Sequence, residues 1–301
     1  MSSIAYVTDE EMLEYHRLCR NRTILFWRLS SKRKIADFLP GDLLFFFARP
    51  HRSRKKALIG YAHYDSTKRL SLNQMWAQYG ESTGYSSKQK LVDAMKKAAK
   101  GDIPKSMRCL LLKDVVFFLA PIYPEEVGLN IQNKLESYTY LDRDDPKVTL
   151  RILKVAEDHG IDLWSQDSSR TPDEIFHGDE IRHKMAVIAN ELGEFSGSTN
   201  EKTRINKVLE EKLKERKWEM IRGSTTDCMK VLKDTITIGL PYIYQTNDFN
   251  VRTNELFGKI TLYRLLGKKY HVDRRFQFEL LSDKSVSEMK ELVEELNHEE
   301  L

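Results

Sequence analysis

The sequence has 301 residues, with 49 lysines and arginines against 45 aspartates and glutamates, so its net charge is only +4. Because the net charge is small, it does not indicate a polyanionic partner, and only local clusters of positive charge can do so. Three widely spaced cysteines give neither a disulfide framework nor a cysteine-based metal site, which favours a reducing, cytoplasmic location. The length predicts two domains, and 41% hydrophobic residues suffice for their cores.

The first residues, 1–15, are polar and acidic, so we expect no signal peptide, and no apolar run is long enough to cross a membrane. A short strand followed by a helix that begins near Thr8-Asp9 is predicted within residues 4–20. Residues 23–29 alternate well enough to be a strand. A cluster of basic residues, 30–34, follows this strand.

The most informative region covers residues 39–64. Pro40-Gly41 is a turn signal, and the apolar run 43–47 predicts a strand buried on both faces. Residues 57–64 predict a second strand. The loop between these strands carries five cations in eight residues, namely Arg49, Arg52, Arg54, Lys55 and Lys56. Such a loop is either a solvated turn or a site that binds phosphates.

The rest of the first half predicts a helix within residues 70–79, an amphipathic helix over residues 86–100 ending at Gly101, and a long strand over residues 108–119. The acidic run 142–145 followed by Pro146 breaks the pattern. We therefore place the end of the first domain at residue 145 and the second domain at 146–301.

In the second half, helices are predicted over residues 146–159, 179–192, 203–217 and 286–296, with a polar linker or loop at 165–178 and a Gly/Ser loop at 194–200. Strands are predicted over residues 218–221, 228–232, 235–240 and 276–281. The segment 255–266 fits either a helix or a buried strand. The fold class is therefore α+β, with a β-barrel in front and an α/β domain behind.

The first domain resembles the EVE-like branch of the PUA superfamily, of the kind found at the front of some modification-dependent restriction endonucleases. The resemblance covers about half of the chain. It is carried by Pro40-Gly41-Asp42, by the aromatic run 45–47, and by the segments 58–61, 70–86, 109–112 and 116–118. It implies a compact barrel that reads modified bases, often cytosine derivatives, in foreign DNA, whereas other members of the superfamily read RNA.

The residues of the first domain include the types that such a reader needs. A reader of a modified base must extrude it from the duplex and stack it on aromatic rings, while cations on the rim hold the phosphates. The aromatic candidates are Trp27, Tyr61, His63, Trp76 and Tyr79, and the cationic candidates are the five loop residues. The competing interpretation is that aromatic residues at strand and helix spacing are core residues, and that His63 is a packed or surface histidine.

A reader domain in a restriction protein usually accompanies a nuclease. His159, His177 and His183 lack the context of an HNH site. A PD-(D/E)XK site needs carboxylates that bind Mg²⁺ and a nearby lysine. Asp227 and Asp234 are the candidate catalytic carboxylates, but the strand within 235–241 carries no Glu-x-Lys. The second domain is therefore a divergent nuclease, a degenerate one or a different α/β fold.

The composition predicts a cytoplasmic protein, and the resemblance implies that it binds nucleic acid and recognises modified bases in DNA within a prokaryotic restriction or defence system. An Mg²⁺-dependent, modification-dependent endonuclease and an RNA-binding PUA-like protein are the alternatives. DNA that contains modified cytosine is the expected partner, RNA is the alternative partner, and a homodimer is left open. No membrane partner is expected.

Overall fold

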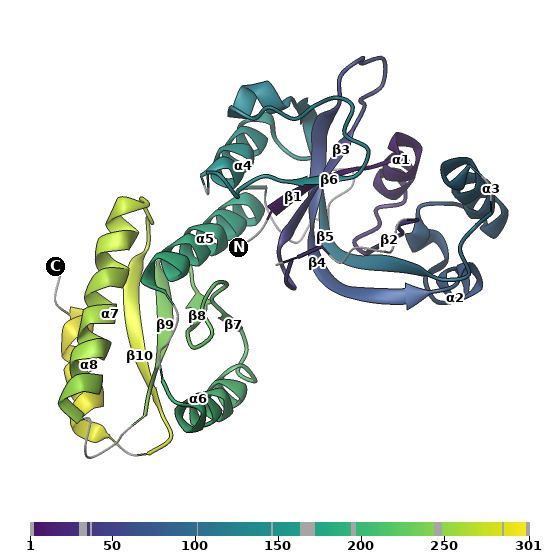
Figure 1. Cartoon of the computed structure of the whole chain (residues 1–301). Helices are drawn as coiled ribbons and strands as arrows, with labels where there is room; N and C mark the ends of the chain where they lie inside the picture. The colour runs from purple at the N-terminus through teal and green to yellow at the C-terminus, as the bar shows by residue number, and fades with distance from the viewer. Residues whose placement is uncertain are drawn as a thin grey trace. The chain divides into compact units, whose positions relative to one another are not determined.

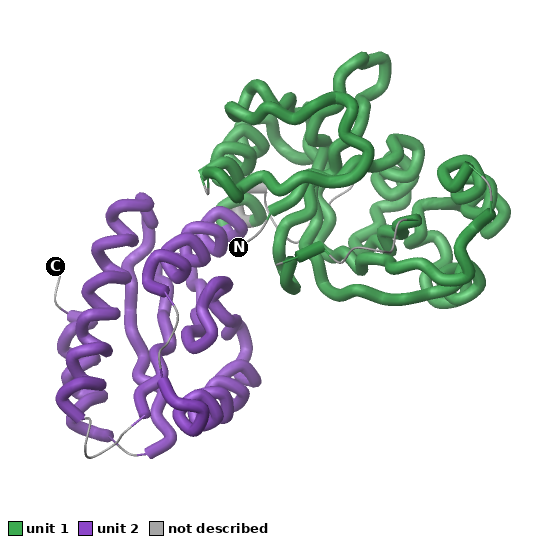
Figure 2. The backbone as a smooth tube through the Cα atoms, viewed as in Figure 1, with its two compact units in different colours: residues 1–177 green, residues 178–301 purple. Residues whose placement is uncertain are grey.

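The structure, a computed structural model, describes residues 3–29, 35–36, 38–100, 102–145, 147–162, 172–193, 197–243, 249–284 and 286–298. The chain divides into two compact units, residues 1–177 (unit 1) and 178–301 (unit 2), which Figure 2 shows in green and purple. Each unit combines a sheet with helices, which agrees with the predicted α+β class. Among the described residues, no helix has the length and apolarity that a membrane crossing requires.

The described residues of unit 1 form a six-stranded sheet in the order β2-β5-β4-β3-β1-β6 (Figure 1). Strands β1 and β3 are parallel, and the other neighbours are antiparallel. The strands are β1 (Ser3–Val7), β2 (Ile24–Phe26), β3 (Leu43–Ala48), β4 (Ala57–Leu70), β5 (Met107–Ile122) and β6 (Tyr138–Tyr140).

Strand β3 is buried on both faces, as its continuous apolar sequence predicts. Leu44 and Phe46 belong to one hydrophobic cluster, whereas Leu43, Phe45 and Phe47 belong to another. This division follows from the two-residue repeat of a strand, which sends alternate side chains to opposite faces. The strand therefore lies between two cores, and every residue in it is at most 1% exposed.

Helices cover both faces of this sheet (Figure 1). On one face lie α1 (Glu10–Leu18), α2 (Leu72–Tyr79) and α3 (Lys88–Ala99), and on the other lies α4 (Val148–His159). The start of α1 follows from the sequence, because aspartate is a favoured N-cap residue and the Asp9 side chain accepts a hydrogen bond from the Met12 amide. Short 3₁₀ helices occupy Gly80–Thr83 and Pro124–Val127. Unit 1 extends beyond residue 145, where we expected the boundary, because the apolar face of α4 completes its second core.

The described strands do not close into the predicted barrel, because the two edge strands, β2 and β6, each pair with one neighbour and not with one another. Strands β4 and β5 nevertheless shift register at three places, and such irregularities bend a sheet. The bend brings the two ends of the sheet together through side chains. The ring of Tyr6 on β1 lies 4.8 Å, between centroids, from the ring of Phe26 on β2. We call this junction the seam.

The described residues of unit 2 form a four-stranded sheet in the order β10-β9-β8-β7, with β9 and β10 parallel. The strands are β7 (Trp218–Met220), β8 (Cys228–Val231), β9 (Thr235–Tyr242) and β10 (Arg275–Ser282). Its helices are α6 (Thr199–Lys212), α7 (Phe249–Lys269) and α8 (Ser287–His298), together with the continuation of α5 (Pro172–Leu192) from unit 1.

Three expectations for the second half change. The ambiguous segment 255–266 is part of helix α7, whose buried residues Leu256, Ile260, Tyr263 and Gly267 recur at helical spacing. Helix α6 covers Thr199–Lys212, whereas the sequence predicted a helix over residues 203–217, and Lys217 adopts a left-handed conformation with φ 74°. Helix α5 begins at Pro172, within the expected linker, and residues 165–171 of that linker lie outside the described residues.

Candidate nucleic-acid interface

The basic loop, residues 49–56, joins β3 to β4. A turn forms where the Ser53 amide donates to the Pro50 carbonyl at 2.8 Å. Arg52, inside this turn, has a positive φ of 61°, a left-handed conformation that is unfavourable for a residue with a side chain. Such a backbone persists only where surrounding contacts hold it.

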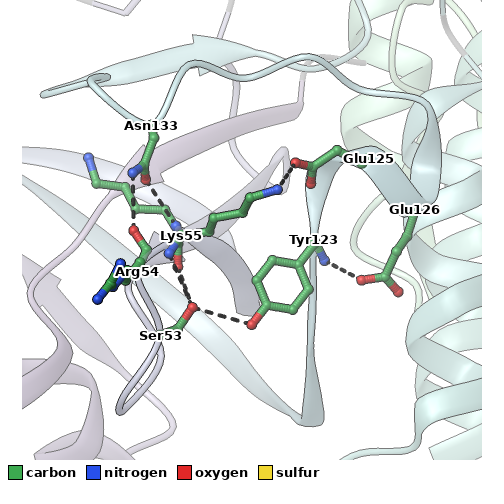
Figure 3. A network of polar contacts seen from close by, with 8 residues as sticks. Ser53, Arg54, Lys55, Tyr123, Glu125, Glu126 and Asn133 are labelled. Carbon is green, nitrogen blue, oxygen red and sulfur yellow. Dashed lines mark hydrogen bonds and ion pairs between the residues drawn. The ribbon is translucent and has the colours of Figure 1, made fainter.

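A polar network supplies these contacts (Figure 3). The Asn133 side chain accepts a hydrogen bond from the Lys56 amide and donates one to the Arg54 carbonyl, both at 3.1 Å. The Ser53 hydroxyl donates to the Lys55 carbonyl at 3.0 Å and accepts from the Lys55 amide at 3.2 Å. It also lies 3.4 Å from the Tyr123 hydroxyl. The segment after β5 thus holds the loop backbone in one shape.

Two of the five cations in the loop are engaged by the protein itself. The Lys55 ammonium lies 2.8 Å from a carboxylate oxygen of Glu125, and this bond raises the pKa of Lys55 and lowers that of Glu125. The Lys56 ammonium donates to the Leu135 carbonyl. Burial, and then the charge of Arg49, lower the pKa of Lys56. Lys56 therefore contributes mainly to the structure of the loop.

The three arginines of the loop are different. Arg49, Arg52 and Arg54 are exposed, and none of their guanidinium groups forms an ion pair or hydrogen bond with another described residue. Guanidinium groups bind phosphate through paired hydrogen bonds. The loop therefore presents three guanidinium groups that no described residue neutralises, on a backbone fixed by hydrogen bonds.

Tyr61 and His63, two of the predicted base-binding residues, lie on β4. Tyr61 is 0% exposed and packs against the rings of Phe45, Phe118 and Phe176, so its ring has no free face for a base. The prediction that it stacks on a base fails because it is a core residue. His63 is half-buried, and its Nδ1 lies 3.9 Å from a carboxylate oxygen of Asp114.

Trp27, Trp76 and Tyr79 lie at the other end of the long strands. All three are half-buried and pack against the hydrophobic cluster that contains Leu44 and Phe46. The basic loop precedes β4, whereas α2, which carries Trp76 and Tyr79, follows it. A strand of 14 residues spans about 40 Å. The structure therefore does not bring the predicted aromatic and cationic residues into one pocket, and the second basic cluster, residues 30–34, lies outside the described residues.

The predicted catalytic carboxylates lie at opposite ends of β8. Asp227 precedes this strand and is 1% exposed, whereas Asp234 follows it in an exposed turn. The Asp227 carboxylate accepts hydrogen bonds from the Lys259 ammonium and the Tyr263 hydroxyl, both at 2.6 Å, and from the Thr226 hydroxyl at 2.9 Å. Burial, and then the Asp227 charge, raise the pKa of Tyr263. This arrangement fastens α7 to the sheet and uses the carboxylate as a structural acceptor.

Within the described ranges, no three histidine, cysteine, aspartate or glutamate side chains are grouped so that they could hold a metal ion. Sequence reasoning did not identify the contacts that Asn133 and Lys259 make in the two sites. Asn133 lies 77 residues from Lys56, and Lys259 lies 32 residues from Asp227. An isolated asparagine and a lysine on a helix carry no local signal for such contacts.

No family model and no curated protein matches the chain. Among solved structures, the chain is similar to ASCH from Zymomonas mobilis, with a TM-score of 0.37 and 16% identity over 51% of this chain and 94% of that one. Two mutant proteins of the same ASCH give a TM-score of 0.37 with 18% and 16% identity, covering 52% and 51% of this chain and 99% and 95% of theirs. A similarity this low carries no argument about the site, which depends on its own residues.

Proposed function

We propose that unit 1 binds nucleic acid through the basic loop. The observation that carries this proposal is the presence of three exposed arginines without acidic partners among the described residues, on a loop held by Asn133 and Ser53. Guanidinium groups match phosphate geometry, and phosphate contacts give affinity without sequence preference. Because the loop is ordered before binding, less conformational entropy is lost on association.

The narrower hypothesis is that the protein reads modified cytosine in DNA as part of a restriction or defence system. The geometry argues against a base pocket around Tyr61, because that ring is enclosed in the core. A reader would therefore use other residues, and RNA in place of DNA is equally compatible with phosphate contacts. The binding experiment separates these outcomes through its choice of oligonucleotides.

The test measures fluorescence anisotropy with oligonucleotides of equal length: single- and double-stranded DNA, duplexes with and without 5-methylcytosine, and double-stranded RNA. Replacement of Arg49, Arg52 and Arg54 by glutamine should weaken binding to every oligonucleotide. It should also reduce the slope of log affinity against log salt by about 2 to 3 on duplex DNA, since each lost phosphate contact contributes about 0.9.

The matched control replaces Lys88, Lys96 and Lys97 by glutamine, which removes the same charge from exposed positions of α3. This control should leave the salt slope near that of the parent. Equal losses in both triple variants would show that only net charge matters, and would reject the loop as the binding site. A preference for methylated duplexes that persists in the loop variant would support the narrower hypothesis.

The alternative of an Mg²⁺-dependent endonuclease is tested in the same samples by adding Mg²⁺ and following the length of the DNA. The described geometry favours binding over cleavage, because Asp227 already accepts three hydrogen bonds and Asp234 lies at the far end of β8. Cleavage by the parent that disappears in Asp227→Asn, with folding retained, would establish the enzyme.

A further inference from the structure

A buried arginine lies at the seam, where the two ends of the sheet in unit 1 meet. Arg28 follows β2 and is 5% exposed. Its Nε donates a hydrogen bond to the Tyr6 hydroxyl at 2.8 Å. The guanidinium carbon lies 5.3 Å from the ring centre of Tyr6 and 5.8 Å from that of Tyr138 on β6. These two rings stack on one another at 5.7 Å with an interplanar angle of 18°.

Among the described residues, the charge of Arg28 has no counter-ion. No carboxylate of the described residues pairs with Arg28, and its buried Nη1 has no hydrogen-bond partner among them. A guanidinium group has five N–H donors, of which the Tyr6 hydroxyl uses one. An enclosed charge and an enclosed donor without partners are both costly, and natural proteins rarely retain them without a function.

We propose that Arg28 anchors a binding site for a phosphate group at the seam. The edge formed by Nη1 and Nη2 is the part of a guanidinium that binds two oxygens of an oxyanion side by side. The Tyr6 hydroxyl accepts from Nε and keeps its own proton, which it can donate to a third oxygen. Three donors fit a phosphate group, which offers three oxygens, better than a carboxylate, which offers two.

The surroundings support access and orientation. Tyr6 and Tyr138 are half-buried, so the seam reaches the surface beside their rings. The two edge strands there, β2 and β6, are not hydrogen-bonded to one another. The Phe26 ring, edge-on to Tyr6 at 74°, completes the apolar wall. This site shares no residue with the basic loop and does not depend on it.

The test uses inorganic phosphate as the probe and the full chain as the protein. Binding is measured by isothermal calorimetry and by thermal unfolding, with chloride at equal ionic strength as the reference. The parent should show saturable binding and a rise in Tm with phosphate. Arg28→Lys keeps the charge but loses the paired donors, so its affinity should fall by about tenfold or more.

Tyr6→Phe keeps the ring against Arg28 and removes only the hydroxyl, and it should weaken phosphate binding by about three- to tenfold. This variant decides the question if Arg28→Lys does not fold. The glutamine variant of Arg49, Arg52 and Arg54 should bind phosphate like the parent, so failure of this site and failure of the basic loop are distinguishable. Nucleoside 5′-monophosphate and a 5′-phosphorylated oligonucleotide, titrated in parallel, show whether the phosphate is bound free or as part of a nucleotide.

The proposal is overturned if phosphate has no saturable effect on the parent, or if Arg28→Lys and Tyr6→Phe both bind it with the affinity of the parent. Acetate that binds as tightly as phosphate would also overturn it, because the site would then select a carboxylate.

Discussion

The most discriminating prediction concerns Asn133, which carries no charge. Asn133→Ala removes the hydrogen bond from the Lys56 amide and the hydrogen bond to the Arg54 carbonyl. All five cations of the loop remain. If the structure of the loop matters for binding, as we propose, affinity for nucleic acid must fall although the number of positive charges is unchanged.

The magnitude follows from the two bonds. Each hydrogen bond contributes about 0.5–1 kcal/mol net at an exposed position, so the ordered loop loses about 1–2 kcal/mol relative to its alternatives. Apparent affinity falls in proportion to the fraction of molecules that hold the binding conformation. We therefore expect binding to weaken by about three- to tenfold, while the free energy of unfolding falls by less than about 1 kcal/mol.

The assay is anisotropy at several salt concentrations, with urea unfolding as the test of stability. The slope of log affinity against log salt should stay that of the parent, because no phosphate contact is lost. Asn130→Ala is the matched control: Asn130 is also exposed and makes no side-chain hydrogen bond with another described residue. A reduced slope in Asn133→Ala, or unchanged affinity while the triple arginine variant loses binding, would refute the reasoning.

Three further predictions concern Glu125, Asp227 and two groups with shifted pKa values, His16 and Asp142. Glu125→Gln frees Lys55 from its ion pair, so binding should tighten about two- to fivefold and the salt slope should steepen by about 0.9, whereas Asp102→Asn, an equal charge change at another exposed site, should leave both quantities unchanged. Asp227→Asn breaks a pair with a carboxylate that is 1% exposed, and should cost about 2–3 kcal/mol in urea unfolding; exposed Asp234→Asn should cost less than about 0.5 kcal/mol, and equal costs would contradict the structural role of Asp227. Burial lowers the pKa of His16 to about 3, so the unfolded chain takes up a proton before the folded chain does as the pH falls. The free energy of unfolding should therefore fall by about 2 kcal/mol between pH 7 and pH 5, and His16→Gln should abolish this loss. Burial raises the pKa of Asp142 to about 6, so here the folded chain takes up the proton first. The free energy of unfolding should therefore rise by about 1 kcal/mol between pH 7 and pH 5, and this gain should disappear in Asp142→Asn. Profiles of unfolding free energy against pH that run parallel to the parent in both variants would contradict these assignments.

Much of the secondary structure could be predicted from local patterns. The apolar run of β3 predicted a strand covered on both faces, and that strand lies between two hydrophobic clusters. The helical spacing of Leu72, Met75, Trp76 and Tyr79 predicted α2. The basic loop was located between two strands. These features depend on neighbouring residues, whose periodicity and turn chemistry are read directly from the chain.

The candidate site was predicted only in part. The cations of the loop were identified, but their division into three exposed arginines and two engaged lysines depends on Glu125 and Leu135. The grouping of Tyr61 with those cations failed because an aromatic residue on a strand has the same sequence pattern in a core as in a binding pocket. Only the face of the sheet on which it lies, and what covers that face, separates the two.

The amino-acid sequence by itself determined where most strands of unit 1 and the basic loop lie, because these depend on residues adjacent in the chain, but it did not predict β6 or the full lengths of β4 and β5. Tertiary structure alone decided that Asn133 holds the loop, that Lys259 neutralises Asp227, and that Arg28 meets Tyr6 and Tyr138 at the seam. The physical reason is that these contacts join segments far apart in the sequence. They arise from the bending of a sheet and the packing of helices, which no local pattern of residues specifies.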